Sequence, residues 1–360
     1  MASVEENRGG RVMPGFVGEA QRQSRGSDAA IAMERKKGAN MNVHVLRRLG
    51  ICLSVLGLLL FKVDLVLADA NCAAAKSADG IVVAPEEPAK KTLNILGFGN
   101  SFTYSLDPYF QEVVKSAGYG MRFGLLTIGG KSLEQHWSNI QKEEADPTYK
   151  QFKTYTYREK LQSVPWDVVV FQQSSPLGWK PESFFPFVQE LAAYVKKNAP
   201  TAEVLLQQTW SYRTDDKRLE EWGLTQESMY RKLVDAYAET AKKLGGVRVI
   251  PMGEAVQWAR ENQPQGYKPL VRAEFTFPDV PDMGNYFTGN IHWNDKHTAL
   301  EGDAYHLNAR GRYLQACVWF AFLFDANTEE ITYVPAELTP EDAKFIRQAA
   351  QRIVNEKKAK

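Results

Sequence analysis

The 360-residue chain has little cysteine and no bias toward one sign of charge. Its three cysteines, Cys52, Cys72 and Cys317, are too few and too scattered for a disulfide framework. The 44 Lys and Arg residues balance 43 Asp and Glu residues, and no basic block stands out, so nothing indicates a nucleic-acid partner. Hydrophobic residues make up 44% of the chain, which is typical of a globular protein with a sizeable core.

The sequence also lacks an N-terminal hydrophobic run long enough to span a membrane comfortably. The apolar stretch 49–61 follows two arginines and is interrupted by Lys62 and Asp64. Together with an Ala-Asp-Ala site, it predicts a secretory signal peptide at about 41–70, cleaved after Ala70. An uncleaved membrane anchor is the alternative.

We expect an exported chain, periplasmic or extracellular in a bacterium, with no stable membrane span after cleavage. Residues 1–70 are interpreted as an N-terminal extension plus signal, and the Ala-, Pro- and charge-rich residues 71–90 as a linker. Residues 91–358 are expected to form a single domain with insertions at about 140–165 and 262–302. Nothing in the sequence defines an oligomeric state.

Short apolar runs alternate with helix-like segments after the linker. The predicted strands are 92–99, 121–130, 166–175, 202–210 and 247–253. The predicted helices are 107–118, 182–200, 225–246, 308–324 and 339–354. This alternation predicts an α/β fold with a five-stranded parallel sheet covered on both faces. Such sheets bind ligands beyond the carboxyl ends of their strands.

A serine follows the first predicted strand directly. In "LNILGFGNSFT" the apolar run ends at Gly99-Asn100, and Ser101 is next. Taken alone, this pattern favours a helix cap or a turn residue. Its place at the carboxyl edge of a parallel sheet also makes Ser101 a candidate nucleophile.

Near the C-terminus, "EGDAYHLNARG" places Asp303 three residues before His306. On a turn, this spacing lets the carboxylate accept a hydrogen bond from one ring nitrogen. That bond leaves the other nitrogen free to act as a base.

An acyl-transfer site also needs hydrogen-bond donors aimed at the oxyanion. Gly129 and Gly130 end the second predicted strand and are placed to present a backbone N–H. The third predicted strand ends in Gln172, Gln173, Ser174 and a further serine, where a glutamine amide can donate. An ordinary turn and polar satisfaction of a strand end are the structural alternatives.

In this order, "GNSFT", the glycine pair, "QQSS" and Asp-x-x-His resemble the SGNH (GDSL-like) hydrolase superfamily from about Leu93 to Phe324. The chain is most similar to a bacterial branch whose first block reads "GNSFT". The resemblance implies a three-layer α/β/α flavodoxin-like sandwich with a five-stranded parallel sheet. It implies no metal and no cofactor.

The resemblance also assigns roles to individual residues. It implies that Ser101 is the nucleophile and an oxyanion donor, that His306 is the base, and that Asp303 orients it. Gly130 matches the second-block glycine, with Gly129 as the alternative. The implied activity is that of a serine esterase acting through an acyl-serine intermediate, with O-acyl or O-acetyl carbohydrate as the expected substrate.

The third block departs from the superfamily pattern. Family members have Gly-x-Asn-Asp there, with the Asn side chain in the oxyanion hole, whereas this chain reads "QQSS". We expect Gln172 to be the amide donor, with Gln173 and Ser174 as alternatives. This third oxyanion contact is the weakest element of the interpretation.

One rival interpretation is a metal-dependent hydrolase. The stretch 292–306 contains His292, Asp295 and His297 in addition to the Asp-x-x-His pair. Zinc and similar ions use such ligands, although this spacing fits no defined ligand signature.

Another rival is a non-catalytic glycan-binding module of the same fold. Its sugar-stacking side chains would be tryptophans. The tryptophans considered are Trp137, Trp179, Trp210, Trp222 and Trp293.

Overall fold

The computed structural model describes residues 89–359 of the chain. The predicted signal peptide at 41–70 lies outside the described residues, as does nearly all of the predicted linker. Cys52 and Cys72 also lie outside them. Cys317 is a free thiol buried in the core.

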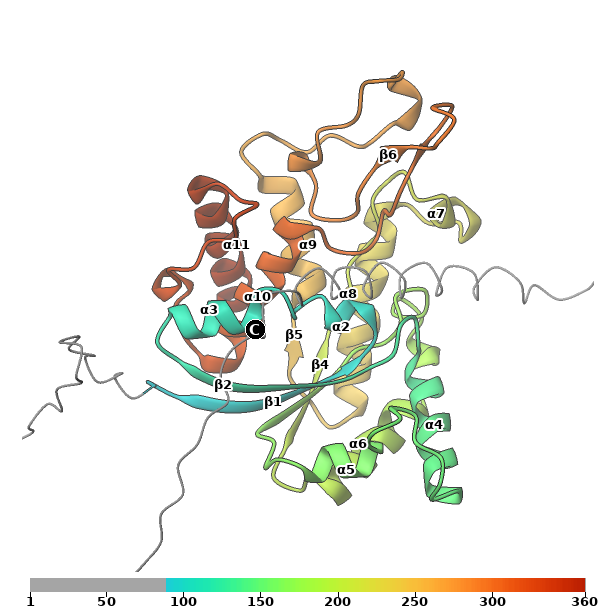
Figure 1. The fold of residues 1–360 in the computed structure, drawn as a ribbon, viewed down its shortest axis with the longest axis vertical. Helices are drawn as coiled ribbons and strands as arrows, with labels where there is room; N and C mark the ends of the chain where they lie inside the picture. The colour runs from blue at the N-terminus through green and yellow to red at the C-terminus, as the bar shows by residue number, and fades with distance from the viewer. Residues whose placement is uncertain (1–88, 360) are drawn as a thin grey trace, which may run out of the picture. The chain divides into compact units, whose positions relative to one another are not determined.

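Five parallel strands form the central sheet, in the order β2-β1-β3-β4-β5 (Figure 1). They are β1 (Thr92–Gly99), β2 (Gly120–Thr127), β3 (Val168–Phe171), β4 (Glu203–Gln207) and β5 (Val249–Ile250). β1 pairs with β2 along its whole length and with β3 from Ile95 to Phe98, so it is flanked on both sides. The predicted α/β fold with a five-stranded parallel sheet is confirmed.

Helices cover both faces of the sheet (Figure 1). One face carries α3 (Phe110–Ser116), α9 (Met252–Asn262), α10 (Ala309–Phe324) and α11 (Pro340–Lys358). The other carries α4 (Leu133–Ala145), α5 (Tyr157–Gln162) and α6 (Phe187–Asn198). α8 (Gln226–Lys243) contacts α9, β5 and the short 3-10 helix η1 (Pro181–Ser183). The core lies between these layers.

Several helix boundaries follow from local sequence signals. The side chains of Thr225, Asn308 and Thr339 each accept a backbone N–H and cap α8, α10 and α11. Within the predicted helix 182–200, Pro186 is the N-cap residue of α6, which begins only at Phe187. α10 is apolar on all sides because α3, α9 and α11 surround it against the sheet. Within residues 89–359, no helix has the length and apolarity needed to cross a membrane.

The structure contains two long helices that the sequence pattern did not predict. α4 begins with a capping box between Ser132 and Gln135, but its mostly polar composition hid its helical spacing. α9 begins at Met252, directly after a strand of two residues, so the predicted strand 247–253 merged the two elements. Residues 140–165, expected as an insertion, hold the end of α4 and the whole of α5.

The second expected insertion has little regular structure. Residues 262–302 contain the 3-10 helices η2 (Arg272–Glu274) and η3 (Met283–Asn285). They also contain the antiparallel pair β6 (His292–Trp293) and β7 (Leu300–Glu301). Figure 1 shows this segment extending above the carboxyl edge of the sheet.

A buried histidine supports the end of the central strand. His136, on α4, is 0% exposed, and its Nε2 lies 2.7 Å from the carbonyl oxygen of Gly99. Because a carbonyl only accepts, Nε2 carries the proton, and Nδ1 accepts from the Tyr157 hydroxyl at 2.7 Å. Burial lowers the pKa of His136 to about 4, although the bond to Gly99 opposes this shift. The imidazole is therefore a neutral structural group.

This histidine predicts a specific pH dependence of stability. Its folded pKa lies below the unfolded value of about 6.5, so the unfolded chain binds the proton first. The contribution of neutral His136 to the free energy of unfolding is complete above the unfolded pKa and is lost as the pH falls toward 4. The loss amounts to roughly 3 kcal/mol once the imidazole is fully protonated. Urea unfolding at pH 7, 5.5 and 4.5 should show a shallower dependence in His136→Gln than in the wild type. Parallel curves for the two proteins contradict the assignment, and His292→Gln is the surface control.

Candidate active site

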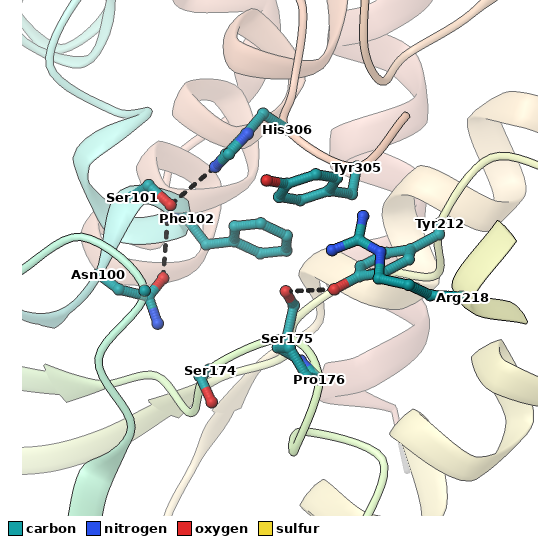
Figure 2. Close-up of a pocket in the computed structure, with 11 residues that line it drawn as sticks. Asn100, Ser101, Phe102, Ser174, Ser175, Pro176, Tyr212, Arg218, Tyr305 and His306 are labelled. Atoms are coloured by element: carbon teal, nitrogen blue, oxygen red, sulfur yellow. Dashed lines mark hydrogen bonds between the residues drawn. The ribbon is translucent and has the colours of Figure 1, made fainter. Parts of the chain in front are cut away.

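The nucleophile candidate begins a short helix at the end of β1. Helix α2 (Ser101–Tyr104) has Asn100 as its N-cap, whose Oδ1 accepts the N–H of Phe102 at 3.1 Å. The Asn100 Nδ2 donates to the carbonyl of Lys131 at 3.0 Å and ties this turn to the loop after β2. The capping role considered for Ser101 therefore belongs to Asn100. The Ser101 hydroxyl is left to face the pocket (Figure 2).

Glycine at position 99 lets this turn pack closely against the neighbouring strand. A Cβ on Gly99 would lie 2.7 Å from both Gln172 Oε1 and Thr103 Oγ1. Any larger residue would separate α2 from β3. The Gly-Asn-Ser order thus serves close packing, capping and exposure of the hydroxyl in turn.

Ser101, His306 and Asp303 form a continuous hydrogen-bonded series. Ser101 Oγ lies 2.8 Å from His306 Nε2, and His306 Nδ1 lies 2.5 Å from Asp303 Oδ2 (Figure 2 shows the first contact). The other Asp303 oxygen accepts the backbone N–H groups of Tyr305 and His306 at 2.7 and 3.0 Å. The structure brings together the three residues that the sequence singled out.

The electrostatics of Asp303 suit an orienting role. Burial acts to raise the pKa of this carboxyl, but the hydrogen bond and charge of His306 and the two backbone donors outweigh it. The pKa of Asp303 therefore lies below its ordinary value. An ionised Asp303 holds the proton on Nδ1 and leaves the Nε2 lone pair for the serine hydroxyl.

The loop after β4 holds the histidine segment in place. Trp210 Nε1 donates to the carbonyl of Tyr305 at 2.7 Å, and the Arg213 backbone N–H donates to Ala304 at 2.9 Å. The buried Trp210 ring also stacks on Phe102, with centroids 4.1 Å apart. Trp210 thereby contacts both the turn around Ser101 and the segment that carries His306.

Of the two glycines considered as oxyanion donors, Gly130 alone reaches the pocket. Gly130 lines the same pocket as Ser101, whereas Gly129 is not among the lining residues. Gly130 has φ +69°, a conformation that other residues rarely adopt. Within residues 89–359, the N–H groups of Ser101 and Gly130 donate to no other protein atom. Both remain available to a substrate oxygen.

The structure does not place Gln172 as the third donor. This side chain is 1% exposed, its Nε2 donates to the Gln173 carbonyl, and its Oε1 accepts from Thr103 Oγ1 and Asn100 N at 3.0 and 3.4 Å. Gln172 therefore supports the turn around Ser101 through Asn100 and Thr103. The expectation of an amide donor was wrong because burial forces this amide to find partners within the protein.

Gln173 is also engaged within the protein. It accepts from Leu133 N and Ser174 N and donates to the Ser183 carbonyl at 3.0 Å. Of the three residues proposed for the third contact, Ser174 alone lines the pocket, and Figure 2 shows its hydroxyl turned away from Ser101.

Some pocket residues escaped the sequence analysis. The pocket, with a volume of about 170 Å³, is lined by Asn100, Ser101, Phe102, Gly130, Ser174, Ser175, Pro176, Tyr212, Arg218, Tyr305 and His306. Ser175 Oγ lies 2.8 Å from the Tyr212 hydroxyl. Tyr212 and Arg218 belong to the loop after β4 and to α7 (Lys217–Glu221). No motif marks them, although their position after the carboxyl end of a strand was a usable signal.

The residues that only the two rival interpretations invoke do not line the pocket. In the described part of the chain, no three His, Cys, Asp or Glu residues group to hold a metal ion. His292 is exposed on β6, and His297 stacks on Phe277 with centroids 4.0 Å apart. None of the five tryptophans considered for sugar stacking lines the pocket.

Comparison with known proteins identifies relatives of this fold. The family described as "Domain of unknown function (DUF4886)" matches residues 94–298, more than half of the chain. The crystal structure of a DUF4886 family protein from Bacteroides uniformis is 28% identical, with a TM-score of 0.59. It covers 73% of this chain and 95% of that chain. Among curated proteins, the comparison found no match.

Two further solved structures are more distant. A candidate SGNH hydrolase from Slackia heliotrinireducens is 22% identical (TM-score 0.35, covering 50% of this chain and 91% of that one). A candidate GDSL-like lipase from Parabacteroides merdae is 14% identical (TM-score 0.38, covering 64% and 95%). At these TM-scores neither says anything about the activity of this chain. The predicted resemblance to the SGNH superfamily is confirmed by features of this chain itself: the order of its five parallel strands and the Ser-His-Asp series.

The glycine pair offers a matched test of the oxyanion hole. Gly130→Ala places a Cβ at φ +69°, which costs about 1–2 kcal/mol and displaces the N–H. We expect kcat to fall by about 10²-fold, the order found when one oxyanion donor is lost. Gly129→Ala should stay near wild-type activity, because a Cβ there meets no atom within 4 Å. Equal effects of the two substitutions on 4-nitrophenyl acetate hydrolysis contradict the assignment of Gly130.

Removing the charge of Asp303 tests the orienting role. Asp303→Asn offers an amide that no longer favours the Nδ1–H tautomer of His306, so kcat should drop by roughly 10⁴-fold. KM should change little, because Asp303 does not line the pocket. Steady-state kinetics measure both constants, and Asp325→Asn, on an exposed carboxylate, is the control. A variant with wild-type kcat rules the role out.

Proposed function

This chain belongs to the DUF4886 family, and we propose that it is a serine esterase working through an acyl-Ser101 intermediate. The observation that carries the proposal is the contact of 2.8 Å between Ser101 Oγ and His306 Nε2, continued from His306 Nδ1 to Asp303. A serine within hydrogen-bond reach of an oriented imidazole is the arrangement of an activated nucleophile. The superfamily resemblance supports a hydrolase.

The chemistry requires two acyl-transfer steps. His306 Nε2 takes the hydroxyl proton of Ser101 while Oγ attacks the ester carbonyl carbon, and the N–H groups of Ser101 and Gly130 hold the oxyanion. When the tetrahedral intermediate collapses, the imidazolium returns this proton to the departing alcohol oxygen. A water molecule, deprotonated by His306, then attacks the acyl-serine and releases the acid and the free serine.

The pocket favours a short acyl group on a polar carrier. Its volume of about 170 Å³ is small, and the ring of Phe102 offers apolar contact beside the nucleophile. Serine hydroxyls and the Tyr212 hydroxyl supply polar partners farther along the same pocket. We propose an O-acetyl or similar O-acyl carbohydrate as the substrate. Export through the predicted signal at 41–70 is part of this proposal.

Substitution of the nucleophile tests the proposed activity directly. Ser101→Ala removes the attacking oxygen, so 4-nitrophenyl acetate turnover should fall to the rate without enzyme. Ser116→Ala, on α3, should keep wild-type turnover, because that hydroxyl bonds only the nearby carbonyl of Val113. Release of nitrophenol is followed by absorbance, and intact-protein mass spectrometry should detect an acyl adduct only where Ser101 is present. Undiminished turnover by Ser101→Ala overturns the proposal.

A further inference from the structure

The pocket has two chemically different ends. Ser101 and His306 mark one end, and Arg218 with the Tyr212 hydroxyl marks the other, with the Phe102 ring between them (Figure 2). The proposed mechanism uses only the first end. Among the described residues that line the pocket, Arg218 alone has a side chain with a permanent charge.

Arg218 is held in a rigid position. Its Nε and Nη2 donate to the two carboxylate oxygens of Asp216 at 2.8 and 2.5 Å. The guanidinium carbon lies 4.4 Å from the ring centroid of Tyr212 and 4.1 Å from that of Tyr305. Figure 2 shows the guanidinium reaching between these two rings. The guanidinium is therefore already oriented before a ligand binds, and binding would cost the Arg218 side chain little further conformational entropy.

The guanidinium keeps donors for a second partner. Asp216 takes two of its five N–H donors, and the side chain remains 31% exposed. Burial acts to lower the pKa of Arg218, but the bonds to Asp216 and the adjacent Tyr212 raise it above its ordinary value. Arginine has no acceptor atom, so the group that it binds must accept hydrogen bonds.

The surroundings favour an anion over a neutral acceptor. No Asp or Glu occurs among the described residues that line the pocket, so no carboxylate faces a bound anion there. Asp216, paired with the same guanidinium, offsets part of its positive charge. The affinity of Arg218 for an anion should therefore come from short charge-assisted hydrogen bonds and not from long-range electrostatic attraction.

We propose that Arg218 binds an anionic group of the substrate, close to the ester that Ser101 attacks. The preferred substrates are then esters carried by acidic molecules, above all O-acylated sugars that bear a carboxylate, sulfate or phosphate. This inference rests on the proposed esterase function and specifies its substrate class. Arg218 determines specificity and takes no part in proton transfer.

Matched substrates test the anion preference. Acetate release is measured from an O-acetylated methyl glucuronoside and from the corresponding glucuronamide, which has the same ring and no charge. The wild type should favour the acid by about tenfold or more in kcat/KM, mainly through KM, as charge-assisted hydrogen bonds allow. O-Acetyl glucose, its 6-sulfate and its 6-phosphate show which anion is preferred.

Variants at the same position separate binding from folding. Arg218→Met should reduce the acid-to-amide ratio to about one, and Arg218→Lys should keep part of it, because lysine retains the charge without the planar fork. Arg231→Gln, on an exposed helix arginine paired with Glu227, should keep the full ratio. Thermal unfolding checks each variant, and the lysine variant decides the test where the methionine variant does not fold.

A binding measurement keeps this inference separate from the proposed activity. Calorimetry with Ser101→Ala should give a Kd for glucuronate about tenfold below that for glucuronamide, and Arg218→Met in the same background should remove the difference. A chain that hydrolyses no ester but shows this difference overturns the esterase and keeps the anion site. An acid-to-amide ratio near one in the wild type, or a ratio that Arg218→Met leaves unchanged, overturns the anion site.

Discussion

The contact between Ser101 Oγ and His306 Nε2 joins two residues that are 205 positions apart in the chain, and the site depends on it. It forms because the parallel sheet puts the end of β1 beneath the segment that leads into α10. Bonds from Trp210 and Arg213, in the loop after β4, then hold that segment. Three separate segments must therefore be placed together before the imidazole reaches the serine hydroxyl.

Buried glutamine amides connect these segments. Gln207 Oε1, at the end of β4, accepts from Gln315 Nε2 and Trp319 Nε1 on α10 at 2.9 and 2.6 Å. Gln315 Nε2 also donates to the carbonyl of Phe102 at 2.8 Å, and Gln172 supports the same turn from β3. A buried amide without partners costs several kilocalories per mole, so each of these bonds favours a single register of helix against strand. The polar strand ends are thus mainly structural, and they support the turn that carries Ser101.

The division of the pocket follows from the same topology. The turn after β1 carries the proposed nucleophile, whereas the segment after β4, which includes α7, brings Tyr212 and Arg218 to the opposite end. In a parallel sheet, loops from different strands meet at one edge and can vary independently. Under the proposed function, acyl transfer and recognition of the rest of the substrate therefore fall to different segments of the chain.

Much of the fold was predictable, because alternating apolar strands and capped amphipathic helices leave local signals. β1 was predicted at its observed bounds, and α8, α10 and α11 each begin one residue after the start that was predicted for them. α4 was missed because its stability comes from one buried stripe on a mostly polar helix. A strand of only two residues, β5, gave too little pattern to separate it from α9.

The candidate active site was likewise predictable where local sequence decides a residue's position, and was not predictable where tertiary contacts decide it. Ser101, the glycine pair and the Asp303-x-x-His306 pair could be singled out from the chain alone, because position after a strand, glycine and i,i+3 spacing are local properties. Local sequence was insufficient for "QQSS", since burial and partner geometry decide whether an amide faces the pocket or the protein. Only the packed structure turned Gln172 inward and brought Arg218 to the pocket, because both outcomes depend on contacts between residues far apart in the chain.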